Sequence, residues 1–400
     1  MTLFSMRVAG FVLAGCLLST AVARAATESV VYAFQGGSDG ALPAADLINV
    51  GGTLWGTTQQ GSADNCGTVF SVTPAGAEKV VYAFGDGSGG CSPYAGLTEM
   101  GGILYGTAVL GGERGGGTVY SVTRQGAGKV LYSFPASGDP LGGLIHVHGV
   151  LYGTTATGGD ENCNHGHGCG TAFSLTAAGT LTELYFFHGK DGFLPNSRLL
   201  YMGGTLYGTA AEGGEHACDG RIKCGTVFSV SPSGGGKLVY PFKGGSDGLG
   251  PSADLIRLGG VLYGTTASGG GTGCSGYGCG TVFSVTTTRV ENIMYSFQGG
   301  GDGAYPHAGL INVHGTFYGT TAGGGSGSCS INGITGCGTV FSVTPEGVET
   351  VVDSFQGGSD GADPLASLIE VGGTLYGTTE FGGGTGCGGN GCGTVFAITP

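Results

Sequence analysis

Charge is scarce in this 400-residue chain: Asp, Glu, Lys and Arg together make up 10% of it, and tryptophan occurs once. Apolar residues nevertheless reach 40%, which a disordered glycine-rich chain would lack. Basic residues number 14 against 27 acidic ones, so the formal net charge is −13. This acidic balance argues against nucleic acid and anionic membrane surfaces as partners.

Other patterns are missing as well. Glycine accounts for 92 residues, far above the usual ~7%, but it does not recur at every third position, which excludes collagen. Beyond the first 25 residues no stretch has a helical period. No serine elbow, P-loop, His-Glu metalloprotease motif or EF-hand spacing occurs. The sequence therefore predicts a β protein rich in tight turns, without a recognisable catalytic signature.

Residues 1–25 are typical of a secretion signal. Arg7 supplies the positive charge, an apolar core follows, and "ARA" (23–25) offers small residues for cleavage. An alternative is lipidation, because "LAGC" resembles a bacterial lipobox and would leave Cys16 at the mature N-terminus. We expect a secreted protein, extracellular or periplasmic, with a lipid anchor at Cys16 as the alternative.

The rest of the chain, residues 26–400, is expected to form one domain. No second apolar run of ~20 residues follows the leader, so no transmembrane segment is expected. "LYGT" or a close variant occurs seven times, at intervals of 47 to 58 residues and with no linker between the copies. The glycines of these copies are Gly56, Gly106, Gly153, Gly208, Gly264, Gly319 and Gly377.

Each repeat contains four short runs rich in Val, Ile, Thr and aromatic residues. In the first repeat they are "LINV" (47–50), "TLWGTT" (53–58), "TVFSVT" (68–73) and "KVVYAF" (79–84). The two residues "GG" between the first pair suit a hairpin turn. Runs such as "VVYAF" are apolar on both faces, so each predicted sheet needs neighbours above and below it.

Seven four-stranded sheets stacked around a ring satisfy that requirement, and this is the β-propeller. The chain opens on a lone fourth strand (30–34) and ends on a third strand (393–399). A ring closed by the N-terminal strand makes the strand totals match. An open array would leave raw edges at both ends. We therefore predict an all-β, seven-bladed propeller whose N-terminal strand completes the last blade; an open or differently closed β array is the alternative.

A family resemblance rests on the repeated motifs "GGTLYGTT" and "CGTVFSVTP", separated by a glycine-rich loop. They resemble the GloVer tandem repeats of bacterial secreted proteins, over residues 28–400. The resemblance implies secretion and a repeat fold, and it implies no activity for any residue of this chain.

Thirteen cysteines occur, one of them in the leader. Ten form local couples within one loop of a repeat, which in a secreted protein predicts disulfides that each close a glycine-rich loop. The couples are Cys163 with Cys169, Cys218 with Cys224, Cys274 with Cys279, Cys329 with Cys337, and Cys387 with Cys392.

Cys66 and Cys91 remain. Cys66 begins a third strand, and Cys91 follows the fourth strand of the same blade. Since antiparallel neighbours bring the start of one strand beside the end of the next, we predict a Cys66–Cys91 disulfide. No free thiol is then left for catalysis.

The same antiparallel geometry predicts that both long loops of every blade lie on one face, the candidate functional surface.

In "CNHGHGC" (163–169), His165 and His167 with the two cysteines could ligate zinc or copper; the simpler interpretation is a disulfide with solvated histidines. Repeated Asp-Gly steps could form a carboxylate ring that contributes to a calcium site, or be ordinary turns. Their aspartates are Asp39, Asp247, Asp302 and Asp360.

One strand position is aromatic in every repeat, which predicts packing between blades rather than a sugar site. It holds Trp55, Tyr105, Tyr152, Tyr207, Tyr263, Tyr318 and Tyr376. Acids that fall at no shared position are scattered: Glu99, Glu161, Glu183, Glu212 and Glu380. No cofactor is required by any motif.

Because the prominent residues are the repeated ones, we expect a non-catalytic module that binds a glycan or a protein through its long-loop face. The first alternative is an enzyme acting on a carbohydrate or another small ligand at the channel mouth. Such an enzyme should gather non-repeated acids or histidines there. The second alternative is a structural surface protein.

Overall fold

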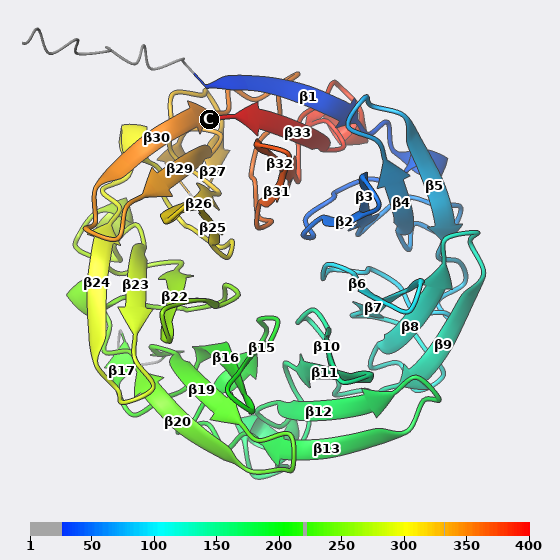
Figure 1. Ribbon diagram of the computed structural model, residues 1–400, viewed down its shortest axis with the longest axis vertical. Coiled ribbons are helices and arrows are strands. Elements are labelled where there is room, and N and C mark those ends of the chain that lie inside the picture. The colour runs from blue at the N-terminus through cyan, green and yellow to red at the C-terminus, as the bar shows by residue number, and fades with distance from the viewer. Residues whose placement is uncertain (1–25, 219–221, 332) are drawn as a thin grey trace, which may run out of the picture.

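The computed structural model describes residues 26–218, 222–331 and 333–400, and the predicted leader lies outside the described residues. Seven antiparallel sheets stand side by side in a closed ring (Figure 1). This is the predicted seven-bladed β-propeller. Among the described residues, no helix has the length and apolar character needed to cross a membrane.

Each blade has four principal strands. The innermost strands, which face the channel, are β2 (Ile48–Val50), β6 (Thr98–Met100), β10 (Ile145–Val147), β15 (Leu200–Met202), β21 (Ile256–Leu258), β25 (Ile311–Val313) and β31 (Ile369–Val371). The second strands are β3 (Thr53–Thr58), β7 (Ile103–Ala108), β11 (Val150–Thr155), β16 (Thr205–Glu212), β22 (Val261–Thr266), β26 (Thr316–Thr321) and β32 (Thr374–Thr379).

The third strands are β4 (Thr68–Val72), β8 (Thr118–Thr123), β12 (Thr171–Thr176), β19 (Thr226–Val230), β23 (Thr281–Val285), β29 (Thr339–Val343) and β33 (Thr394–Thr399). The outermost strands are β5 (Glu78–Ala83), β9 (Gly128–Ser133), β13 (Leu181–Phe186), β20 (Gly236–Pro241), β24 (Glu291–Ser296), β30 (Glu349–Ser354) and β1 (Thr27–Ala33). We number the blades 1 to 7 in the order of their innermost strands.

The loops carry smaller elements. Short strands are β14 (Phe193–Pro195), which pairs with β16, the hairpin of β17 (Ala217–Cys218) and β18 (Ile222–Lys223), and the hairpin of β27 (Ser330–Ile331) and β28 (Ile334–Thr335). Single 3-10 turns are η1 (Gly37–Asp39), η2 (Asn164–Gly166), η3 (Gly245–Asp247), η4 (Cys274–Gly276), η5 (Gly300–Asp302) and η6 (Cys387–Gly389).

The N-terminal strand closes the ring, as predicted. β1 pairs with β33 in antiparallel register, Thr27 opposite Thr399, so the first strand of the chain becomes the outermost strand of blade 7. Figure 1 shows β1 and β33 side by side at the rim. Pairing the two ends of the chain removes the exposed edges that an open array would leave.

Aromatic pairs join every blade to the next. The phenylalanine after each outermost strand packs against the third-strand aromatic ring of the following blade, mostly edge to face. The centroid distances run from 4.7 to 5.3 Å, for Phe34–Phe70, Phe84–Tyr120, Phe134–Phe173, Phe187–Phe228, Phe242–Phe283, Phe297–Phe341 and Phe355–Phe396.

The glycine of each "LYGT" motif makes room for that aromatic ring. Gly56 lies opposite Phe70 in the register of β3 and β4, and a β-carbon on Gly56 would come within 2.7 Å of the Phe70 ring. The aromatic residue before the glycine is buried between blades, as Trp55 is in a core cluster with Leu97 and Leu104 of blade 2. The repeated aromatic position is thus architectural, as expected.

Six disulfides tie the long loops. They join the predicted pairs, from Cys163–Cys169 to Cys387–Cys392, and Cys66 with Cys91. Disulfides in this number are consistent with an extracellular or secreted protein.

Candidate functional site

A five-residue segment leads into every innermost strand and faces the channel. It reads proline, a variable residue, a small residue, a second variable residue and leucine, as in "PAADL" (43–47) of blade 1 and "PNSRL" (195–199) of blade 4. The segment follows the crossing loop, so it lies at the long-loop end of the channel. We call it the entry segment, and we call the ring formed by its second variable residue the girdle.

Backbone hydrogen bonds fix the beginning of the entry segment. The residue before its proline has a left-handed backbone in every blade, for example Leu42 with φ 58° and Asp363 with φ 59°. The N–H of Leu42 donates to the carbonyl oxygen of Cys392 at 2.9 Å, and that of Asp363 to Cys337 at 3.0 Å. In five blades the cysteine that precedes the third strand therefore helps to anchor the segment of the next blade, and Gly116 takes this role in blade 2.

A threonine holds the middle of the segment. In most blades a second-strand threonine donates its hydroxyl to the carbonyl oxygen at or beside the small residue of the following blade. Thr209 Oγ1 donates to Ala253 O at 2.9 Å, and Thr378 Oγ1 donates to Ala45 O at 3.3 Å across the ring closure. With the segment held on both sides, its two variable side chains are directed to the channel.

The girdle position occurs in every blade, but the residues that occupy it differ in chemistry. Four of its members are glycine or serine, and three are charged. In blade order the girdle consists of Asp46, Gly96, Gly143, Arg198, Asp254, Gly309 and Ser367.

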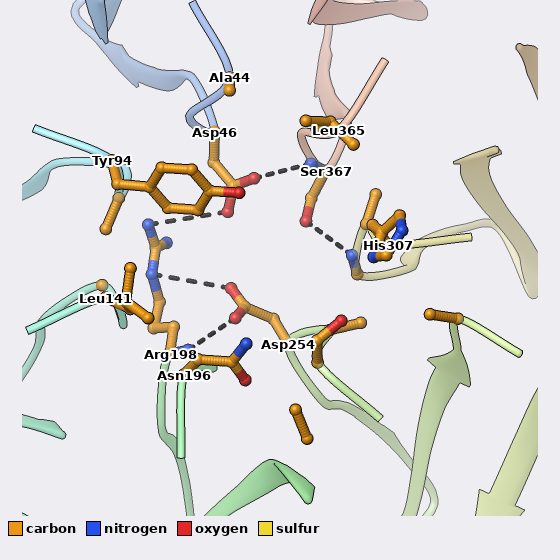
Figure 2. A pocket seen from close by; sticks show the side chains of 18 of the residues that line it. Ala44, Asp46, Tyr94, Leu141, Asn196, Arg198, Asp254, His307, Leu365 and Ser367 are labelled. Atoms are coloured by element: carbon orange, nitrogen blue, oxygen red, sulfur yellow. Dashed lines mark hydrogen bonds and ion pairs between the residues drawn. The ribbon is translucent and has the colours of Figure 1, made fainter. Parts of the chain in front are cut away.

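The three charged members form one cluster, drawn in Figure 2. Arg198 Nη2 lies 3.8 Å from Asp46 Oδ2, and Arg198 Nε lies 3.8 Å from Asp254 Oδ2. The carboxylates also accept backbone hydrogen bonds, from Arg198 N to Asp254 Oδ1 and from Ser367 N to Asp46 Oδ1, both at 2.7 Å. The arginine thus bridges two acids that come from different blades.

The girdle glycines provide the space for this cluster. A β-carbon on Gly96 would lie 2.6 Å from Arg198 Nη2, and one on Gly143 would lie 2.8 Å from Arg198 Nε. On the other side, Gly309 N donates to Ser367 Oγ at 3.0 Å, and a β-carbon on Gly309 would collide with that hydroxyl. A larger residue at these places would displace the charged groups.

A cavity of about 610 Å³ opens above the girdle on the long-loop face. We call it the long-loop chamber. Its polar wall comes from blades 4 to 6, with Asn196, Glu212, Ser252 and His307 besides the girdle. Its apolar wall comes from the first variable residue of blades 7, 1, 2 and 3, namely Leu365, Ala44, Tyr94 and Leu141 (Figure 2).

Burial disfavours charge in this chamber. Burial, and then the neighbouring Asp46 carboxylate, raises the pKa of Asp254 above its ordinary value, while Arg198 opposes that rise. Burial likewise raises the pKa of Glu212 and lowers the pKa of His307. Asp254 can therefore carry a proton at a pH where an ordinary carboxylic acid has lost it.

A second group of acids lies toward blade 7. Burial, and then the charge of Glu380, raises the pKa of Asp363 to about 7. Burial and the charges of Glu380 and Asp363 raise the pKa of Tyr94, which is 40% exposed. Asp363 and Glu380 thus lie close enough to Tyr94 of the apolar wall to influence its hydroxyl group.

The aspartates singled out in the sequence do not form a ring around the channel. Each lies in its own crossing loop and accepts the N–H of the residue four positions earlier, as Asp39 does from Gln35 at 2.6 Å and Asp247 from Lys243 at 2.7 Å. Asp302 and Asp360 do the same. Three of the four also accept the hydroxyl of a fourth-strand tyrosine. They stabilise turns.

The histidines of the 163–169 loop are exposed. His165 lies within η2 and His167 follows it, and the two cysteines of this loop are joined to each other, which leaves no thiolate for a metal. Within the described parts of the chain, no three His, Cys, Asp or Glu side chains come together in a way that could hold a metal ion.

The girdle residues are not among those predicted from the sequence. Aligning the seven entry segments on their proline and leucine exposes the signal, because one position then reads Asp, Gly, Gly, Arg, Asp, Gly and Ser. Of the scattered acids, Glu212 lines the long-loop chamber, whereas Glu99 accepts the N–H of Gly102 in a hairpin turn.

The chain matches the Gloeobacter/Verrucomicrobia repeat over residues 13–166 and 139–332. The comparison with curated proteins finds no match to its sequence.

Several solved structures are similar to the chain at low identity. One is a gluconolactonase from Xanthomonas campestris, 13% identical, with a TM-score of 0.42 over 74% of this chain and 82% of that one. Another is a GH74 enzyme from Niastella koreensis, 14% identical, with a TM-score of 0.47 over 81% of this chain and 46% of that one. A third, from Thermus thermophilus, is described provisionally as an oxidoreductase (glucose dehydrogenase); it is 15% identical, with a TM-score of 0.45 over 93% of this chain and 99% of that one.

These findings correct the expected function. The non-catalytic binding module predicted from the sequence is contradicted, because the similar propellers are described as enzymes. The non-repeated acids that we expected of an enzyme do gather at the channel mouth. With identities of 12% to 15% and TM-scores under 0.5, the likeness assigns no reaction to this chain.

Proposed function

The chain belongs to the Gloeobacter/Verrucomicrobia repeat family, and we propose that it is a hydrolase that acts on a small polyhydroxylated molecule in the long-loop chamber. The observation that carries the proposal is the Asp46–Arg198–Asp254 cluster, placed at a position that is otherwise glycine or serine. A repeat that only maintained the fold would have no need of three charges at this ring.

The walls of the chamber favour a sugar or a sugar derivative. Hydrogen-bond acceptors dominate the polar wall: the carboxyl groups of Asp46, Asp254 and Glu212, and the amide oxygen of Asn196, which is buried without a partner. A ligand that satisfies them must bring several donors, as hydroxyl groups do. The opposite wall offers the Tyr94 ring and Leu141 to the apolar face of such a molecule.

The girdle supplies an acid and a base for cleavage of a carbon–oxygen bond. Asp254, with its raised pKa, donates a proton to the leaving oxygen. Asp46, which lies beside Arg198 and accepts the N–H of Ser367, takes a proton from the attacking water, whose oxygen bonds to the carbon. Arg198 stabilises negative charge that develops between the two acids.

The proposed location is outside the cytoplasm, in the extracellular space or the periplasm, after removal of residues 1–25. The six disulfides support this proposal, because such bonds persist in oxidising compartments. Peptide mapping of the exported protein would show whether the mature chain begins at Ala26 or at a lipid-modified Cys16.

A substrate screen tests the activity. The oxidised protein is assayed against aryl glycosides and aldonolactones, together with Asp254→Asn and Asp46→Asn. Each substitution should lower kcat by at least ~100-fold, as loss of a general acid or base does. Glu113→Gln is the matched control, since Glu113 is an exposed acid on the same face outside the chamber. Turnover that survives both girdle substitutions, or no turnover of either substrate class by the folded protein, would refute the proposal.

A further inference from the structure

A second cavity of about 690 Å³ lies on the other side of the girdle and opens on the hairpin face. We call it the hairpin chamber. It shares Asp46, Arg198, Asp254 and Ser367 with the long-loop chamber, so these four residues form the polar floor between the two cavities.

The walls of the hairpin chamber are apolar. They are built from the first residue of the innermost strands and from the leucine before it, in six of the seven blades. These wall residues are Leu47, Ile48, Ile145, Leu199, Leu200, Leu255, Ile256, Leu310, Ile311, Leu368 and Ile369. Such a lining offers a ligand hydrophobic burial rather than hydrogen bonds.

At the mouth of the hairpin chamber, which we call its rim, the repeated position also holds different residues in different blades. The middle residue of the innermost strand is Asn49, Glu99, Asn312 or Glu370 in four blades, where its side chain accepts an N–H of the adjoining hairpin turn. Blades 3 and 4 instead have His146 and Tyr201, which line the chamber.

A third aromatic side chain, that of His148, completes this side of the rim. His148 takes the place of the first glycine of the hairpin turn, with a left-handed φ of 51°, and also lines the chamber. Its ring meets that of Tyr201 edge to face, with centroids 6.4 Å apart. Glycine occupies this turn position in five blades, and His314 of blade 6, with a φ of 52°, does not line the chamber. It is therefore the location of His148 at the chamber mouth that points to a contact role.

We propose that the hairpin chamber binds an uncharged aryl alcohol. The ring lies between the isoleucine and leucine walls, the histidine and tyrosine rings cover it at the rim, and the hydroxyl reaches the polar floor. The chamber has one polar end and apolar sides, and a phenol-like molecule has the same distribution of polarity. This chamber shares its polar floor with the proposed catalytic cluster but lies on the opposite side of the girdle, so ligand binding here and hydrolysis there are tested independently.

The floor also disfavours an aryl carboxylate. It carries two carboxyl groups against one guanidinium, and that guanidinium is already placed between both acids. An anion placed there would lose its hydration in a cavity with apolar walls, and the one guanidinium is already shared between two acids. We therefore expect the binding of a neutral ring to exceed that of its carboxylate.

Binding of 2-naphthol to the full oxidised protein tests the proposal, followed by its fluorescence and by calorimetry at neutral pH. We expect saturable binding with one site per chain, and 2-naphthoate at least tenfold weaker. Ile145→Asn in the wall and Tyr201→Ala at the rim should each weaken 2-naphthol binding at least fivefold. Leu141→Asn, in the wall of the long-loop chamber, is the control and should not.

The variants separate the outcomes. If Ile145→Asn fails to fold, Tyr201→Ala, at a partly exposed residue, still decides the matter. Absence of saturable binding, wild-type affinity in the Tyr201 variant, or loss of binding only in the Leu141 variant would each overturn the hairpin-chamber site. Sugar hydrolysis that persists without naphthol binding would leave the proposed function standing.

Discussion

The backbone N–H of Arg198 donates to Oδ1 of Asp254 at 2.7 Å, while Nε of the same arginine lies 3.8 Å from Oδ2 of that carboxylate. Arg198 thus contacts both carboxylate oxygens of Asp254, one through its backbone and one through its side chain. Because blades 4 and 5 are adjacent in the ring, the contact needs no long loop. It fixes the carboxyl group that we propose as the acid.

Gly96→Ala should impair the site without unfolding the protein. The added β-carbon would lie 2.6 Å from Arg198 Nη2, so the guanidinium must move away from Asp46. Gly96 does not have a left-handed backbone, so alanine brings no backbone strain. We expect at least a ~10-fold fall in kcat/KM, with a melting temperature within ~2 °C of the wild type. Gly301→Ala is the control, since its β-carbon would meet nothing within 4 Å; equal activity in both variants would contradict this role of Gly96.

The pH dependence of activity should report Asp254. An acid must be protonated to donate, so activity should fall as the pH rises through the raised pKa of this group. Removing the Asp46 charge removes one cause of the raised pKa of Asp254. In Asp46→Asn the alkaline limb of the residual activity should therefore move to lower pH. A pH–rate profile of both proteins measures this, and an unchanged or opposite shift would show that Asp46 does not act on the pKa of Asp254.

Stability should decrease between pH 5 and pH 8. Burial, and then the charge of Asp302, raises the pKa of Glu349 to about 7, although a hydrogen bond from Tyr295 lowers it. An acid whose pKa is higher in the folded state stabilises the fold when protonated, and this contribution is lost as the pH rises from about 4.5 to 7. Glu349→Gln should flatten the decline in melting temperature, whereas Glu183→Gln, at an exposed position, should not. A decline as steep in Glu349→Gln as in the wild type would exclude this acid as a cause.

Asp353→Tyr should stabilise the ring closure. Asp353 occupies the place that tyrosine holds on the other outermost strands; Tyr295, for example, donates to Asp302 Oδ2 at 2.9 Å. The aspartate instead faces Asp360 and Glu28 of β1. Burial, and then the charges of Asp353 and Asp360, raises the pKa of Glu28 to about 7. Tyrosine would replace repulsion by a hydrogen bond. The melting temperature should rise, and more at pH 8 than at pH 5; a lower value at pH 8 would contradict the prediction.

Loss of the Cys66–Cys91 bond should cost more than loss of a local disulfide. Its cysteines are 25 residues apart, against 5 for Cys274–Cys279. If loop closure in the unfolded chain dominates, the double-alanine variants should lose ~3 and ~2 kcal/mol of unfolding free energy respectively. Denaturant titration measures both. The reverse order would show that native-state contacts dominate instead.

The repeated residues made the architecture predictable. Seven copies of "LYGT" and "GTVF" set the strand pairs, because the glycine of one motif lies opposite the aromatic residue of the other, as Gly56 does opposite Phe70. The offset between the first and last strands predicted that β1 would close the ring. Cysteine spacing predicted the same pairs that the structure contains. All of these relationships are local or recur in successive repeats, so they can be read along the chain.

The channel site is not local. Asp46 and Arg198 are separated by three blades of sequence and meet only because the ring brings every entry segment to one axis. The space for Arg198 comes from Gly96 and Gly143, two further blades, and no pairwise pattern in the chain relates these four positions. The sequence by itself determined the blades, their number and their closure, since the same strand and turn motifs recur in every repeat. Only the tertiary structure decided which unlike side chains meet, because closure of the ring, and not their separation in the sequence, determines which residues face each other across the channel.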